Sequence, residues 1–165
     1  MPYSNVVTDG GNREVGNLST PINGSPVSLA FLRNLPAYRH GLSPNRRGLE
    51  IGMAHGYFIY GPFALLGPLR DSTGFGPISG LLASIGLVSI LTIALSLYSA
   101  TGVSRPTETF TTPNPPSELG STEGWSEFAS GFFLGGTGGA IFAYFLCTTP
   151  YVEPLVKIAS GIWSS

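Results

Sequence analysis

The chain has 165 residues, a length that suits one domain. Only 10% of its residues are charged, against about 25% in a soluble protein, whereas glycine (23) and proline (14) are frequent, as they are in membrane helices. The net charge of −1 argues against a nucleic-acid partner, and the single cysteine, Cys147, excludes a disulfide within the chain. These values favour a membrane protein.

The N-terminal stretch 1–21 contains no apolar run of signal-peptide length. No cleaved secretory signal is therefore expected. Membrane insertion is expected to use the internal apolar segments.

Three apolar segments follow, at 51–69, 78–100 and 128–152, and each is long enough for a membrane span of about 20 residues. With their flanks they predict spans at about 48–69, 78–100 and 126–150. In the first, Gly61-Pro62 and Gly67-Pro68 predict a kink or an early helix end. Buried helices of a soluble protein fit poorly, because 78–100 has no charged stripe. We expect one all-α membrane domain over 1–165, with three transmembrane helices, an extended N-terminal arm and a proline-rich second loop.

Basic residues predict the orientation of these spans. Two, Arg70 and Lys157, lie on one side of the membrane, and six lie on the other: Arg13, Arg33, Arg39, Arg46, Arg47 and Arg105. The positive-inside rule places the N-terminus and second loop on the cytoplasmic-type side, and the C-terminus opposite.

The second loop, TGVSRPTETFTTPNPPSELGSTEGWSE, is polar, and its four prolines favour extended backbone. At its end, Ser121, Thr122 and Glu123 predict a capped helix start. Trp125 fits an anchor at the membrane interface.

Two rows of glycine have helical spacing. Gly131, Gly135 and Gly139 lie four apart, a pattern that lets another helix backbone approach closely, although the sequence does not identify that helix. A second row is formed by Gly48, Gly52 and Gly56. We expect this row to leave flat space for a macrocycle beside the first span.

Glu50 and His55 are the ionisable groups of that first span. On a helix they point about 140° apart, so they do not share one metal ion. Further zinc ligands, a second intramembrane histidine for haem and a chain of acids for proton transfer are all lacking. One interpretation is two independent axial ligands of macrocycles. The alternatives are a helix-to-helix hydrogen bond for His55, and for Glu50 an ion pair with Arg46 or Arg47.

The stretches NLPAYR at 34–39, GLSPNRRGLEIGMAHGYFIYGPFALLGPLRDS at 41–72 and STEGWSEFASGFFLGGTGGAIFAYFL at 121–146 resemble subunit XI of photosystem I, and LSTPI at 18–22 also fits. The resemblance covers nearly the whole chain. It implies three membrane helices with a structured N-terminal arm, a few chlorophyll a molecules, beta-carotene and no enzymatic activity. It further implies that Glu50 and His55 are ligands to the magnesium of separate chlorophylls.

The same resemblance implies the setting of the chain. The partners are the other photosystem I subunits, including the large core subunits, the same subunit in neighbouring complexes, lipids and pigments. The location is the cyanobacterial thylakoid membrane, with the N-terminus stromal and the C-terminus lumenal. In trimer-forming relatives a loop matching GPLRD contributes to a calcium site, so Asp71 and the Pro68 carbonyl are candidate calcium ligands. The alternative is an Arg70–Asp71 turn without metal.

Two departures from the family pattern bear on assembly. TETFTTPNPPSE in the second loop is longer and richer in proline than in typical trimer formers, and the C-terminal CTTPYVEPLVKIASGIWSS also differs. Both lie where subunits of this family meet, which favours a tetramer or dimer over a trimer. A small transporter or channel subunit without pigment is the alternative function, and the absence of charge from spans two and three argues against it.

Overall fold

The computed structural model describes residues 18–150 and, beyond them, 154, 155, 157, 158 and 161, which are also helical. Residues 18–150 form α1 (Pro26–Asn34), α2 (Pro44–Leu66), α3 (Gly76–Ala100), the 3-10 helix η1 (Ser117–Gly120) and α4 (Thr122–Thr148). Apart from a single bridge residue, Ser19, the described residues contain no β-structure. The predicted all-α class is confirmed. Residues 1–17 of the expected arm, and 151–152 at the end of the third apolar segment, lie outside the described residues.

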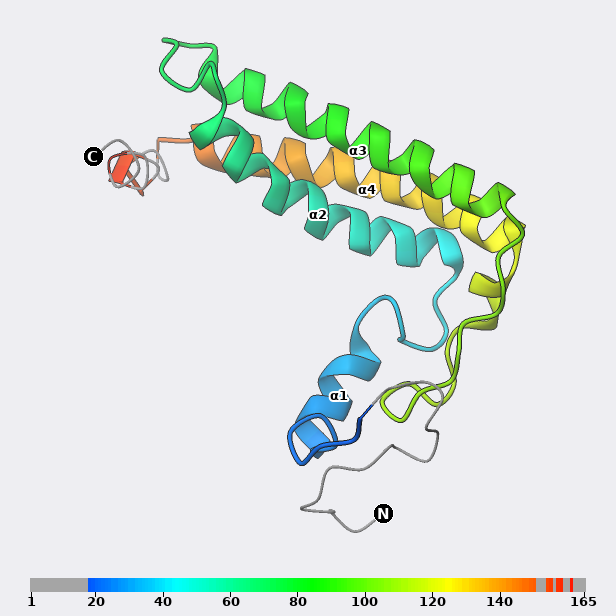
Figure 1. Cartoon of the computed structure of the whole chain (residues 1–165). Helices are drawn as coiled ribbons and strands as arrows, with labels where there is room; N and C mark the ends of the chain where they lie inside the picture. The colour runs from blue at the N-terminus through cyan, green and yellow to red at the C-terminus, as the bar shows by residue number, and fades with distance from the viewer. Residues whose placement is uncertain (1–17, 151–153, 156, 159–160, 162–165) are drawn as a thin grey trace.

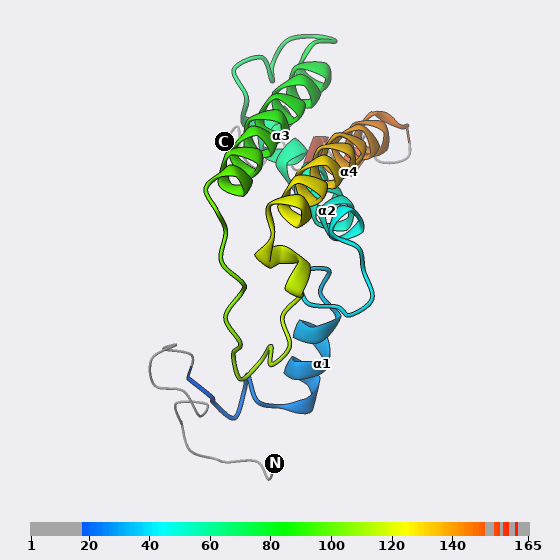
Figure 2. The same ribbon diagram turned by 90° about the vertical axis from the view of Figure 1, so that its right-hand side faces the viewer.

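The three long helices lie side by side and alternate in direction, and α4 packs most extensively against α2 (Figure 1). At one end of this bundle, α1 and the loop at 101–121 project together (Figure 2). The turn between α2 and α3 lies at the opposite end, beside the end of α4. The arm and the second loop therefore share one end of the molecule.

Local sequence explains where the helices begin and end. Ser25 and Ser43 each precede a proline, and their side chains cap α1 and α2 by accepting the main-chain N–H three residues on. Ser121 caps α4 by accepting the N–H of Gly124 at 3.0 Å, as the sequence predicts. Helix α2 continues through Pro62 and ends at Leu66, before Gly67-Pro68. The predicted early end of this segment is confirmed.

The outer surfaces of the bundle are apolar. In the part of the chain that the structure describes, α3 and α4 are long and apolar enough to cross a membrane. Their exposed side chains include large apolar groups, such as Leu82, Ile90 and Leu97 on α3 and Leu134 and Phe145 on α4, each about 60% exposed. Helices of a water-soluble bundle would carry charge on such faces, so this surface suits lipid or an apolar partner.

Two clusters of buried side chains fill the centre of the bundle. Val88 of α3 meets Phe128 and Phe132 of α4 near the arm end, and the other cluster contains Tyr60, Leu81, Ala140 and Ala143. The Ser99 hydroxyl donates to the Thr122 carbonyl at 2.9 Å, which joins the end of α3 to the start of α4. The 101–121 loop is therefore closed at its base.

Candidate functional site

The α2–α4 contact is made by main chain against main chain. A Cβ added at Gly48, Gly52 or Gly56 of α2 would lie closer than 3.0 Å to the α4 main chain, at Phe128, Phe132 and Gly136 respectively. Real Cβ atoms do not tolerate such a distance. This row is therefore filled by α4, and our expectation that it leaves flat space for a macrocycle is wrong.

The glycines of α4 fit into α2 in the same way. A Cβ at Gly131, Gly135 or Gly139 would collide with the main chain of Asn45, Leu49 and Met53 respectively. Close helix packing on this face is confirmed, and its partner is α2 of the same chain. Two interlocking glycine rows thus fix the depth and rotation of α2, and with them the directions of Glu50 and His55.

Glu50 lies on the side of α2 that faces away from the glycine row, in a cluster of arginines. Arg39, in the turn after α1, brings Nη2 within 2.6 Å of both carboxylate oxygens. Arg46 Nε lies 3.4 Å from Oε1, one helical turn away, so the expected Arg46 pairing is confirmed. Three of about four carboxylate lone-pair positions are used in this way, which leaves one acceptor position.

Arg47, the other expected partner of Glu50, instead turns into the protein. It is 2% exposed, and its Nη1 donates to the main-chain carbonyls of Pro36, at 3.0 Å, and Arg39. Its Nε is buried without a hydrogen-bond partner. Arg47 therefore fastens the turn after α1 to the start of α2.

His55 is exposed on the outer side of α2. Its Nδ1 lies 2.8 Å from the carbonyl oxygen of Ile51, on its own helix rather than a neighbouring one. Because a carbonyl oxygen only accepts, Nδ1 carries the hydrogen in the neutral imidazole, and Nε2 keeps its lone pair. The ring also packs edge-on against Phe132, with centroids 5.5 Å apart. The imidazole is therefore held in place through Nδ1, and the lone pair of Nε2 is available to bind a metal ion.

The surface around His55 is apolar and aromatic. Phe58, three residues further along α2 and therefore on the same side of the helix, is 75% exposed, and Phe132 of α4 lies against the His55 ring. Such a surface suits a flat aromatic ligand better than an ion in water, because its burial removes apolar area from solvent.

Asp71 and Pro68 lie in the turn between α2 and α3, and both are exposed. The Asp71 carboxylate is 86% exposed and lies 3.5 Å from Arg70 Nε, as in the alternative of a turn without metal. No group of three or more His, Cys, Asp or Glu side chains that could hold a metal occurs among residues 18–150 or the few described beyond them. Calcium binding here stays a prediction.

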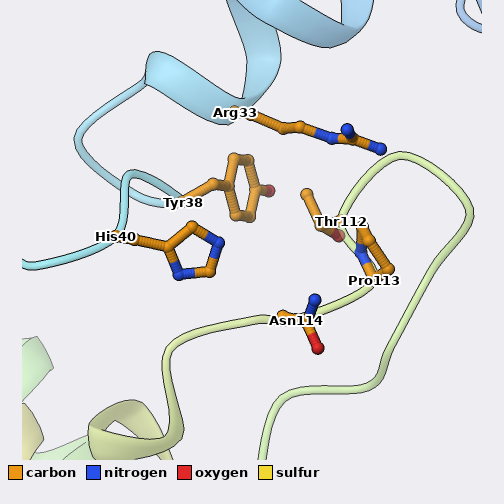
Figure 3. A pocket seen from close by; sticks show the side chains of 6 residues that line it. All are labelled: Arg33, Tyr38, His40, Thr112, Pro113 and Asn114. Atoms are coloured by element: carbon orange, nitrogen blue, oxygen red, sulfur yellow. The ribbon is translucent and has the colours of Figure 1, made fainter.

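A small hollow of about 100 Å³ separates the arm from the second loop (Figure 3). Arg33 Nε donates to the Thr111 carbonyl at 3.4 Å, and Phe110 lies against Gly24. The second loop therefore packs on the arm. Six residues line the hollow: Arg33, Tyr38, His40, Thr112, Pro113 and Asn114.

Sequence reasoning missed three features of this end of the molecule. Helix α1 carries a Ser-Pro start signal at Ser25 that identifies it. Arg47 is a cation in the first turn of α2, where the helix dipole disfavours it, which is a signal that another interaction holds it there. No sequence pattern joins Arg39 to Glu50 across the intervening turn.

Comparison with known proteins identifies the family. The family described as photosystem I reaction centre subunit XI matches residues 5–152. The chain belongs to this family. Subunit XI of Synechococcus elongatus is 62% identical over 161 residues, which is 96% of each chain. That of Crocosphaera subtropica is 59% identical and covers 93% of this chain and 97% of the relative.

A third relative, subunit XI of Nostoc punctiforme, is 56% identical over 86% of this chain and 88% of its own length. The resemblance drawn from the motifs is confirmed. The chain is accordingly a structural subunit of photosystem I and not an enzyme.

Proposed function

We propose that the chain spans the thylakoid membrane three times and holds chlorophyll a and carotenoid at the edge of photosystem I. Helices α3 and α4 supply two spans. Helix α2 supplies the third: its 23 residues extend about 34 Å, and the apolar part at 51–66 extends about 24 Å, which crosses most of a hydrocarbon core of about 30 Å. Its arginines and Glu50 lie in its first two turns, at the arm end, where they meet the membrane interface.

The arrangement of the ends supports a stromal N-terminus. Arg33, Arg39, Arg46, Arg47 and Arg105 all belong to the end that holds the arm and second loop. Arg70 belongs to the opposite end. The positive-inside rule places the first end in the stroma and the α2–α3 turn in the lumen.

The observation that carries the pigment proposal is the free Nε2 of His55. An exposed imidazole whose Nδ1 is held by the Ile51 carbonyl and which is flanked by Phe58 and Phe132 would be a suitable ligand for the magnesium of a chlorophyll. When bound, chlorophyll supplies light absorption and excitation transfer. The chain contributes the ligand atom and orients it through the Ile51 carbonyl.

Glu50 fits a second chlorophyll. Its oxygen is a hard donor that suits magnesium, and one acceptor position stays open. Arg39 neutralises the carboxylate, which lowers the cost of placing it beside apolar pigment and lipid. Beta-carotene and lipid would use the exposed apolar faces of α3 and α4.

Assembly with other photosystem I subunits follows from the family, and we propose that these partners include the large core subunits. We further propose that the chain lies at a contact between neighbouring complexes and favours tetramers or dimers. The glycine face of α4 gives no support, because α2 covers it. Support comes from the second loop, which is held against the arm and so presents a surface of fixed shape.

The pigment proposal is tested by His55→Leu and Glu50→Leu in purified photosystem I. Each variant should lose its own pigment, seen as a separate component in the low-temperature absorption difference spectrum. His40→Leu and Glu127→Leu are matched controls, because they remove an exposed histidine and an exposed acid at the arm end. Unchanged spectra in both site variants would contradict the proposal, and would favour a subunit without pigment.

The assembly proposal is tested by gentle solubilisation and native sizing, with and without residues 107–116. A tetramer or dimer in the unmodified complex, converted to another form by the deletion, is expected. A trimer in the unmodified complex would contradict it. An unchanged tetramer after deletion would remove the loop as the cause.

A further inference from the structure

Arg47 is a charged group in an unfavourable position. It is 2% exposed in the first turn of a helix, where the dipole repels a cation, and its Nε has no hydrogen-bond partner. A side chain of this kind destabilises the fold unless its remaining contacts offset the cost. Those contacts are the carbonyls of Pro36 and Arg39, and the negative charge of Glu118 in η1 also favours the charged guanidinium.

The main chain that Arg47 holds is the main chain that carries Arg39. Residue 39 thus makes two contacts in opposite directions: its carbonyl accepts from Arg47, and its guanidinium donates to Glu50. Arg47 and Glu50 lie three residues apart on α2 and are joined through a residue outside that helix. Moving the turn at 36–39 would move the Arg39 guanidinium from the carboxylate.

We propose that Arg47 and Arg39 form a two-step clamp, in which Arg47 fixes the turn at 36–39 and Arg39 thereby neutralises and orients Glu50 for its ligand. Both are positioning residues. The inference rests on the proposed ligand role of Glu50. It adds a dependence of that site on the arm, which the His55 site, held by its own helix, does not share.

Arg46 is a weaker member of this cluster. Its side chain is 69% exposed and its single contact with Glu50 is 3.4 Å long, so solvent screens it. Arg39, at 35% exposure and 2.6 Å from both oxygens, is the principal counter-charge.

The experiment uses intact photosystem I that carries Arg47→Met, Arg39→Gln or Glu50→Leu, with Arg105→Gln as a control that removes an exposed charge from the same end. Low-temperature absorption and circular dichroism resolve the Glu50 and His55 components, which the Glu50→Leu and His55→Leu spectra define. Arg47→Met and Arg39→Gln should shift or abolish the Glu50 component and leave the His55 component unchanged. Adding Arg47→Met to Glu50→Leu should produce no further change.

An unaltered Glu50 component in assembled Arg39→Gln or Arg47→Met complexes would overturn the clamp. Equal loss of both components would also overturn it, because a general packing defect would not select one site. Where Arg47→Met complexes fail to accumulate, Arg39→Gln decides, since it keeps both carbonyls that Arg47 uses. If Glu50→Leu changes no pigment, the proposed ligand role of Glu50 is wrong, and the clamp is wrong with it. If Glu50→Leu loses a pigment but the two arginine variants do not, the ligand role stands and only the clamp is wrong.

Discussion

The bundle and the arm end of this chain are held together by different forces. Helices α2 and α4 meet through glycines, main chain against main chain. The arm and second loop are held by guanidinium groups on carbonyls and a carboxylate. Close steric fit therefore stabilises the bundle, and charged contacts hold the arm in place. Each region should respond to a different perturbation.

The largest effect is expected in the glycine contact. Gly56→Ala and Gly135→Ala each place a Cβ against an opposing main chain that has no flexible atom to move. Overpacking of this kind costs about 1–3 kcal/mol, and more where backbone must shift. Thermal release of the subunit from purified complexes should occur at lower temperature in both variants. Gly138→Ala is the control, because Gly138 lies on α4 like Gly135 but has open space around it. Equal behaviour of all three variants would remove the distinction.

A smaller effect, of a different kind, is expected at the arm. Arg39→Gln removes the principal counter-charge of Glu50 and should release the arm without separating the helices. Limited proteolysis of the purified complex should cut the arm faster in this variant. In the unmodified complex the same cleavage should accelerate as salt rises toward about 1 M, where the screening length falls to about 3 Å. A cleavage rate that is unchanged both by Arg39→Gln and by high salt would contradict an electrostatic attachment of the arm.

The sequence was informative where one residue type decides the outcome. Helix α3 followed from its lack of charge, the start of α4 from Ser121, and the end of α2 from Gly67-Pro68. The glycine rows were visible, but a row identifies a face and not the object that covers it. Gly52 and Gly56 were therefore assigned to pigment, although Phe132 and Gly136 of α4 cover them.

The candidate site was predicted only in part, for a related reason. Glu50 and His55 stand out as ionisable groups in an apolar segment, and the sequence suffices to select them. Arg39 reaches Glu50 only because a turn folds back on α2, and that turn depends on the buried Arg47. Such a contact depends on tertiary structure, which no periodicity in the chain encodes.

Removing the N-terminal cap of α4 should have a smaller effect on the stability of the subunit than the glycine substitutions. Ser121→Ala removes the acceptor for the Gly124 N–H and should destabilise the subunit by about 1 kcal/mol. Ser121→Asn, which keeps a capping oxygen, should restore most of the loss. Thermal release of the subunit measures both variants. A loss that Asn does not restore would indicate that something other than capping is affected.

The smallest effect is expected between the arm and the second loop. Arg33→Gln removes one long, exposed hydrogen bond to Thr111 and should change stability by less than about 0.5 kcal/mol. The same thermal-release measurement should place it close to the unmodified chain. A shift as large as that of Gly56→Ala would show that the loop contact, and not the glycine contact, dominates the fold.

The most direct test of the account is a high-resolution cryo-electron microscopy map of the native photosystem I complex that contains this chain, inspected at His55. We predict a chlorophyll whose magnesium is bound by His55 Nε2, while Nδ1 remains on the Ile51 carbonyl. A map in which Nε2 is hydrogen-bonded to protein or faces lipid, with no macrocycle on that side of α2, would contradict it.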